Sequence, residues 1–205
     1  MMSTDIAGRD PELGGLFPIA SVDLQLLHLR LERAARDSDL LDIAYRTIDT
    51  PVGELLLAAT PAGLVRVAYA SQDFDAVLAD LATRISPRVL RSHPPLDAAA
   101  REVGEYFAGT RTRFDLPLDL SLTAGFRRQV IEQLREIGYG HRQSYAAIAA
   151  AVGSPRAVRA VGSACGHNPL PVVIPCHRVV RADGSIGQYV GGVNAKTTLL
   201  SLEAA

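Results

Sequence analysis

The hydrophobic positions of the chain fall into three regions with different periods. The first, VDLQLLHLRLERAAR at 22–36, places Leu24, Leu27 and Leu31 at helical spacing. The alternation of Leu27, Leu29 and Leu31 also suits a strand. We favour a helix docked on the body of the protein, within an N-terminal extension at 1–40.

The second region, 41–118, has the pattern of a small α/β domain. Three apolar runs, IAYRTI (43–48), ELLLAA (54–59) and GLVRVAY (63–69), are separated by TPVG and TPAG. Proline–glycine turns between such runs are typical of an antiparallel meander. RTRFDLPL at 111–118 predicts a further short strand.

Two helices are expected within this domain. DFDAVLADLATR at 73–84 and PPLDAAAREVGEYFAG at 94–109 each place their large apolar residues on one face. Pro94 and Pro95 lie near the start of the second helix and Gly109 lies just past its end. The region shows no nucleophile–base spacing, phosphate loop or metal cluster, so we expect it to be structural.

The third region, 119–205, reads as mainly helical. FRRQVIEQLREIG at 126–138 has one apolar stripe and Thr123 as its expected cap. SYAAIAAAVGSPRAVRAVGSACG then predicts a helix-turn-helix, in which Ser144 and Ser154 cap the two helices and Pro155 is the first residue of the second.

A helix-turn-helix pattern alone is weak evidence for DNA binding. The second helix carries Arg156 and Arg159 among residues that are mainly small. Small side chains would let its backbone approach a narrow groove closely. They would equally allow tight packing of one helix on another, and the pattern does not choose between these.

Composition narrows the function classes. Of 205 residues, 48% are hydrophobic and 21% are charged, with a net charge of −1, so any nucleic-acid site must be a local patch. Two cysteines provide neither a disulfide framework nor a four-ligand zinc site. Because no apolar run reaches about 18 residues and no signal-peptide pattern opens the chain, we expect a cytoplasmic protein with no membrane partner.

Candidate chemistry is concentrated in PVVIPCHRVV at 171–180. An apolar run disfavours the thiolate of Cys176, whereas the neighbouring His177 would favour it. Side chains of adjacent residues diverge, so the two need a turn or a bridging water. The terminal segment NAKTTLLSLE, which we expect to be a helix capped by Asn194, has Glu203 as its one acid. Cysteine, water, histidine and glutamate could therefore form a relay.

The combined motifs resemble the O6-alkylguanine-DNA alkyltransferases, also called methylated-DNA–protein-cysteine methyltransferases. PCHRVV is followed by DGSIGQYVGG, a lysine and LLSLE, and SY, SPRAVRAVG and NPLPVVIPCHRV precede it in the family's order. The resemblance spans about 43–203. It implies a ribonuclease-H-like α/β N-terminal domain and a mainly helical C-terminal domain with a helix-turn-helix. It also implies double-stranded DNA carrying O6-alkylguanine as the partner.

The resemblance implies catalytic roles for five residues. Cys176 would accept the alkyl group, His177 would be its water-mediated base, and Glu203 would orient that base. Asn168 would brace the active-site turn, and Tyr145 would donate a hydrogen bond to the guanine as it leaves.

The resemblance also implies which residues meet DNA and the base. Arg159 would fill the space of a flipped nucleotide, from a helix at 155–164 lying in the minor groove. The other residues implied at the DNA surface are Tyr145, Arg127, Ser154, Ala157, Ala160 and Gly162. The walls of the base pocket would be Tyr189, Val190, Val179 and Pro175.

A few positions depart from the family's pattern. Ser154 replaces a frequent asparagine, Val190 replaces a frequent serine, and Ala146 and Ala182 remove polar contacts with DNA that some relatives have. Some relatives hold an N-terminal zinc, but no cysteine precedes Cys165 here. We therefore expect no metal and no cofactor, and Cys165 as a packing residue.

The implied activity is irreversible and stoichiometric, because a thioether has no good leaving group. We expect a monomer that can cluster on DNA and that repairs O4-alkylthymine less well. Two alternatives stay open: a relative that only binds alkylated DNA, and a cysteine hydrolase. The first replaces the nucleophile, which Cys176 retains, and the second needs an oxyanion hole and a directly paired histidine.

Overall fold

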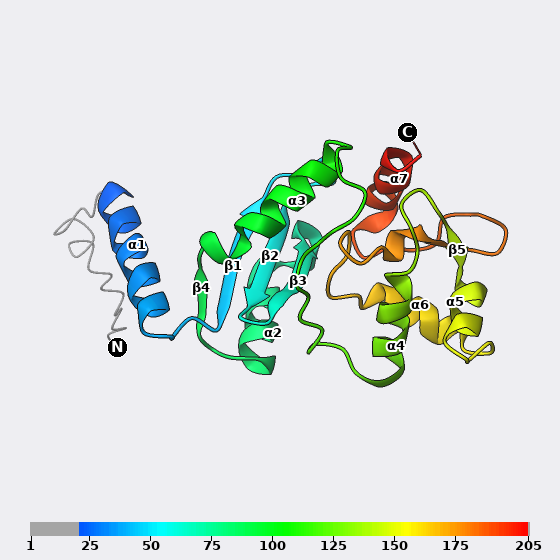
Figure 1. The fold of residues 1–205 in the computed structure, drawn as a ribbon, viewed down its shortest axis with the longest axis horizontal. Coiled ribbons are helices and arrows are strands. Elements are labelled where there is room, and N and C mark those ends of the chain that lie inside the picture. The colour runs from blue at the N-terminus through cyan, green and yellow to red at the C-terminus, as the bar shows by residue number, and fades with distance from the viewer. Residues whose placement is uncertain (1–20, 205) are drawn as a thin grey trace, which may run out of the picture. The chain divides into compact units, whose positions relative to one another are not determined.

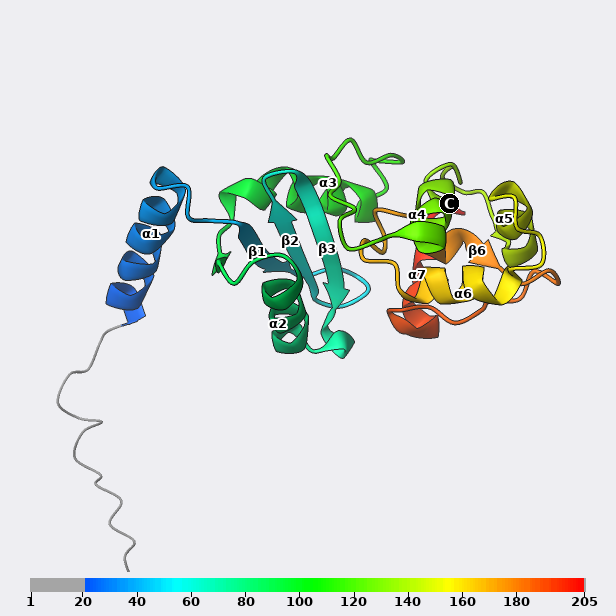
Figure 2. The same cartoon turned by 90° about the horizontal axis from the view of Figure 1, so that it is seen from below.

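The computed structural model describes residues 21–204, which fall into two units, 21–40 and 41–204. Within the first unit, α1 (Ser21–Asp37) is a helix. The helical interpretation of the leucine-rich segment is therefore correct, and its docking on the body stays a prediction. The remaining elements belong to the second unit (Figures 1 and 2).

A four-stranded sheet forms the centre of the N-terminal part of this unit. Its strands are β1 (Ile43–Ile48), β2 (Leu55–Thr60), β3 (Gly63–Tyr69) and β4 (Val89–Arg91), in the order β3-β2-β1-β4. The three predicted meander strands pair antiparallel, as expected, and β4 adds a parallel edge beside β1. The segment 111–118 is not a strand: it contributes one isolated bridge, between Leu118 and Leu64.

Two helices cover the sheet, one on each face (Figures 1 and 2). α2 (Phe74–Arg84) packs on the face that carries Leu56 and Ala58, and α3 (Asp97–Phe107) packs on the face that carries Leu55 and Leu57. Because successive strand residues point to opposite faces, β2 is buried on both sides. Two 3₁₀ turns, Ala70–Gln72 and Pro94–Leu96, precede these helices.

The C-terminal part is mainly helical. It contains α4 (Gly125–Leu134), α5 (Tyr145–Ala151), α6 (Val158–Gly166) and α7 (Gly192–Leu202). A two-stranded parallel ladder joins β5 (Gln143–Ser144) to β6 (Val179–Val180). The predicted fold class, a small α/β domain followed by a helical domain, is confirmed.

Three of the predicted helix caps are wrong, and one is right. Ser144 caps α5 by accepting from the backbone N–H of Ala147. Thr123 instead donates to the carbonyl of Leu120, and α4 starts after Ala124. Ser154 lies in a turn closed by its own N–H bonding to Ala149, so the second helix starts at Val158 rather than Pro155. α7 starts two residues before Asn194.

The two parts share one core. Residues of the sheet and α3, such as Leu57 and Val103, belong to the same buried cluster as Val130 of α4 and Ile148 of α5. A backbone hydrogen bond of 2.8 Å also runs from the N–H of Val67 in β3 to the carbonyl of Pro169. The sheet therefore supports the segment that leads to Cys176.

Candidate active site

A strained turn holds Cys176 at the start of a 3₁₀ helix, Cys176–Arg178. Four residues earlier, Val172 is buried with φ of 72°, a conformation that β-branched residues rarely adopt. The buried Asn168 stabilises this turn. Its Nδ2 donates to the carbonyl of Ile174 at 2.9 Å, and its Oδ1 accepts from the N–H of Leu170 at 3.0 Å.

The Cys176 thiol is buried and bonded to protein. It is 2% exposed, and its Sγ accepts a hydrogen bond of 3.1 Å from Asn168 Nδ2. Burial raises the pKa of Cys176 to about 11, although the Asn168 hydrogen bond and the nearby Lys196 oppose this. The thiol is therefore protonated at neutral pH. Cys165 is also a free, buried thiol, and burial raises its pKa as well.

His177 and Glu203 form a buried pair. His177 Nε2 lies 2.9 Å from Glu203 Oε1, and burial lowers the pKa of the imidazole. Burial opposes ionisation of Glu203, but hydrogen bonds from His177 and Arg178 outweigh it and lower the pKa of the carboxyl to about 2. An ionised carboxylate only accepts hydrogen bonds, so Nε2 carries the imidazole proton. His177 Nδ1 is then an acceptor, and it is buried with no hydrogen-bond partner among residues 21–204.

Glu203 has further donors that the sequence did not reveal. Arg178 donates from Nε and Nη2 at 2.9 and 2.8 Å. Tyr106 of α3 donates from its hydroxyl at 2.7 Å, and the N–H of Gly140 lies 3.4 Å away. The helical pattern marked Tyr106 only as an apolar position, because a contact across 97 residues leaves no local signal. The N-terminal domain thus reaches the active site.

Tyr189 makes a second link to the N-terminal domain. Its hydroxyl lies 3.0 Å from that of Tyr69 in β3, and its ring meets the His177 ring edge-on with 6.3 Å between centroids. Tyr69 packs so closely on Gly191 that a Cβ there would lie 2.5–2.7 Å from the Tyr69 ring. Only glycine fits at position 191 without moving the Tyr69 ring. Val190, the residue before it, is half-buried.

The remaining predicted pocket residues surround the same turn. Pro175 and Val179 flank the 3₁₀ helix and both are buried. The carbonyl oxygen of Val179 accepts a hydrogen bond of 2.6 Å from Lys196 Nζ. One lone pair of this carbonyl oxygen is therefore used by the lysine. Lys196 is fully buried and lies 5.9 Å from the Tyr145 ring centroid. This lysine is the one in the family motif, to which the sequence pattern assigns no role.

The predicted DNA-contacting residues are placed mostly on and before α6. Arg159 and Ala160 are exposed on this helix, Gly162 is half-buried, and Ala157 immediately precedes it. Ser154 is in the turn before α6, and Tyr145 begins α5. Arg127 is on another helix, exposed in the first turn of α4.

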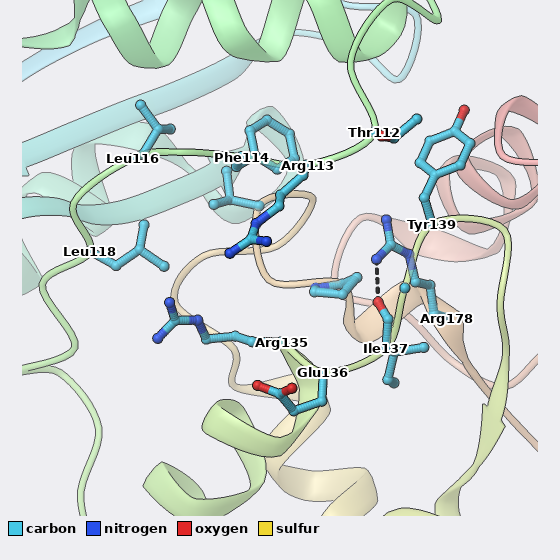
Figure 3. A pocket seen from close by; sticks show the side chains of 13 residues that line it. Thr112, Arg113, Phe114, Leu116, Leu118, Arg135, Glu136, Ile137, Tyr139 and Arg178 are labelled. Carbon is cyan, nitrogen blue, oxygen red and sulfur yellow. Dashed lines mark hydrogen bonds between the residues drawn. The ribbon is translucent and has the colours of Figure 1, made fainter.

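A cavity of about 450 Å³ lies beside the Glu203 network (Figure 3). The segment 112–118 forms one side of it, and the end of α4 through Tyr139 forms another. Arg178 lines it and donates from Nη1 to the carbonyl of Ile137, the bond drawn in Figure 3. Cys176 and His177 do not line this cavity. It borders Arg178, a partner of Glu203, and not the Cys176 thiol.

No three His, Cys, Asp or Glu side chains among the described residues are grouped as a metal site would require. Across residues 21–204, no helix has the length and apolar character needed to cross a membrane.

The fold and site define a class of protein in which a helix-turn-helix domain carries a buried cysteine, supported by a histidine–glutamate pair. The chain belongs to the 6-O-methylguanine DNA methyltransferase family. Residues 43–120 match the model of its ribonuclease-like domain, and residues 125–205 match the model of its DNA-binding domain. The resemblance drawn from the sequence is confirmed.

Named relatives agree with this membership. The chain is 41% identical over 161 residues to the methylated-DNA–protein-cysteine methyltransferase of Mycolicibacterium paratuberculosis, covering 78% of this chain and 92% of the relative. It is 39% identical over 160 residues to the constitutive enzyme of Bacillus subtilis, covering 78% and 94%. The crystal structure of Mycobacterium tuberculosis OGT in complex with DNA has a TM-score of 0.69 and 38% identity, covering 78% and 92%.

Proposed function

We propose that the protein repairs DNA by transferring the alkyl group of O6-alkylguanine irreversibly to Cys176. The observation that carries this proposal is the buried constellation of Cys176, His177 and Glu203 on a domain of the methyltransferase family. It acts once per molecule, because the thioether product has no good leaving group.

The tautomer of His177 explains how the Cys176 thiol is activated. His177 is neutral and holds its proton on Nε2, so Nδ1 is the basic nitrogen, and as a buried polar atom it requires a partner. A water molecule between Nδ1 and Sγ would satisfy it and join the two adjacent side chains. The thiol proton then passes through this water to Nδ1, and ionised Glu203 stabilises the imidazolium.

The transfer step itself is a single displacement. The Cys176 thiolate attacks the alkyl carbon, the carbon–O6 bond breaks, and its electron pair stays on the guanine. Tyr145 donates a proton or hydrogen bond to the leaving base. A thiolate with a pKa near 11 in the resting site is strongly basic, which increases its intrinsic nucleophilicity once it forms.

The target base must leave the duplex to reach a thiol that is 2% exposed. Extruding a nucleotide costs a few kcal/mol. We propose that α6 lies in the minor groove and that Arg159 fills the vacated space. Both assignments are supported by the exposure of Arg159 and Ala160 on this helix. Tyr189, Val190, Val179 and Pro175 would enclose the base.

The proposal extends to the protein's setting. Two free thiols fit a reducing compartment, so we propose a cytoplasmic protein. We also propose that it acts as a monomer that can cluster on DNA, that it repairs O4-alkylthymine less well, and that it uses no cofactor.

One experiment tests the reaction. Duplex DNA containing O6-methylguanine is incubated with the wild type and with Cys176→Ala, and the intact protein mass is measured. We expect a gain of one methyl group in the wild type, no gain in the variant, and DNA binding in both. Transfer by Cys176→Ala, or a methyl group mapped to Cys165, would disprove the assignment. Binding without any transfer would instead indicate a protein that only recognises alkylated DNA.

A further inference from the structure

A second, smaller cavity lies between the N-terminal domain and the helices α4 and α6. Its volume is about 210 Å³. β3 and α2 of the N-terminal domain line it, together with the first turn of α4 and the end of α6. Neither Cys176 nor His177 lines it, but Asn168, which donates to Cys176 Sγ, forms part of its wall.

The lining of this cavity is cationic. Arg66, Arg84 and Arg127 line it together with one carboxylate, that of Asp80, which leaves an excess of two positive charges before His167 is considered. Asp80 is paired with Arg84 at 3.2 Å. Arg127 is exposed and makes no ion pair among the described residues.

Arg66 is the residue that most needs a partner. It is half-buried, and its Nε is fully buried with no hydrogen bond in the described part of the chain. Burial lowers the pKa of its guanidinium, and the nearby Arg84 adds to this, against the attraction of Asp80. A buried donor without an acceptor is costly, so the site favours a ligand that brings anionic oxygen atoms.

The position of the cavity indicates which ligand could supply these anionic oxygen atoms. Gly166 and His167, at the end of α6, form part of its wall. Gly166 lies seven positions after Arg159, which is about 10 Å along a helix. A duplex carries one phosphate charge per about 1.7 Å of its axis, so several phosphates lie within that span.

We propose that Arg66 and Arg84 bind a backbone phosphate of the DNA, so that the N-terminal domain takes part in holding the duplex. The family resemblance already implies Arg127 at the DNA surface; the new element is the pair of arginines on β3 and α2. This inference rests on the proposed function, because it requires α6 to lie against DNA.

The test measures the salt dependence of binding to undamaged duplex DNA. Wild type, Arg66→Gln and Arg84→Gln are compared by fluorescence anisotropy between about 50 and 200 mM salt. Loss of one phosphate contact should make the slope of log K against log salt shallower by about 0.9. The affinity gap between wild type and Arg66→Gln should then narrow about threefold across this salt range.

Control variants distinguish the loss of a specific phosphate contact from the general effect of removing one positive charge. Arg101→Gln removes an arginine of α3, which is 62% exposed and lies across the sheet from α2. It should keep the wild-type slope, and so should Arg66→Lys. Reaction of each variant with free O6-benzylguanine, which needs no DNA, should proceed at the wild-type rate and shows that the variants are folded.

Two outcomes would overturn the inference. If Arg66→Gln and Arg101→Gln change the slope equally, no specific contact exists. If inorganic phosphate at matched ionic strength raises the melting temperature of the wild type but not of Arg66→Gln, and the DNA slope is unchanged, the cavity takes a free anion. Failure of the proposed function is distinct, since it would show as absent methyl transfer with the slopes unaffected.

Discussion

Tyr106 offers a sharp test of how the N-terminal domain supports the active site. It is fully buried, and its hydroxyl donates to Glu203 Oε1 at 2.7 Å. Tyr106→Phe removes this donor and keeps the ring. Hydrogen bonds to charged groups contribute about 1.5–3 kcal/mol, so we expect the free energy of unfolding to fall by that amount at pH 7.

Tyr139 provides a matched control. Its hydroxyl donates to the neutral carbonyl of Leu202 at 3.1 Å, one residue before Glu203, and its ring lies 6.2 Å from that of Tyr106. A hydrogen bond between neutral groups contributes about 0.5–1.5 kcal/mol. Urea unfolding of both variants, with m-values equal to that of the wild type, should therefore show the larger loss for Tyr106→Phe.

The pH dependence of the stability loss provides a second check on the same hydrogen bond. The pKa of Glu203 is lowered in the folded protein, so its stabilisation is fully present above about 4.5 and is lost as the pH falls toward 2. Tyr106→Phe should lower the free energy of unfolding by more than Tyr139→Phe does at pH 5. This difference should become smaller by pH 3. Equal losses at pH 7, or an excess that stays constant to pH 3, would refute a charge-assisted bond to Glu203.

Three further predictions follow from the site. Arg159→Ala should slow repair in duplex DNA much more than reaction with free O6-benzylguanine; equal losses in the two rates would mean that the arginine supports the fold. Gly191→Ala places a Cβ 2.5 Å from the Tyr69 ring and should cost about 1–3 kcal/mol in urea unfolding, part of which the double variant with Tyr69→Ala should recover. Methylation of the buried Cys176 overpacks the site by a similar amount and should lower the melting temperature by at least about 2 °C. Unchanged melting and unchanged hydrogen exchange in α6 and α7 would show that the methyl group is accommodated without strain.

Sequence reasoning predicted elements well where the pattern is local. The alternation at 43–48 and 63–69 gave strands with the observed bounds, and the helical stripe at 73–84 gave α2. Sequence reasoning failed where the structure of a segment depends on the distant segments that pair with it. The segment 111–118 alternates like a strand, yet it pairs with β3 only at Leu118 and forms one side of a cavity. β4, with three residues, is too short for its period to be recognised.

The cap errors have a similar cause. Thr123, Ser154 and Asn194 are all good cap residues. Whether such a residue caps depends on which backbone groups its neighbours leave unpaired. The N–H of Ser154 closes a turn on Ala149, and its carbonyl accepts from Ala157, so the chain turns once more before α6 begins. Residue type alone does not reveal this.

The burial of Glu203, one residue after the end of α7, links these observations. The ends of helices usually fray. Glu203 is instead held by Tyr106, His177 and Arg178, with two donors from the arginine. Without the carboxylate, Arg178 would be a buried charge without its partner, and His177 would lose the acceptor that fixes its tautomer. The N-terminal domain therefore does more than complete a core: through Tyr106 of α3 it holds the carboxylate that fixes the His177 tautomer.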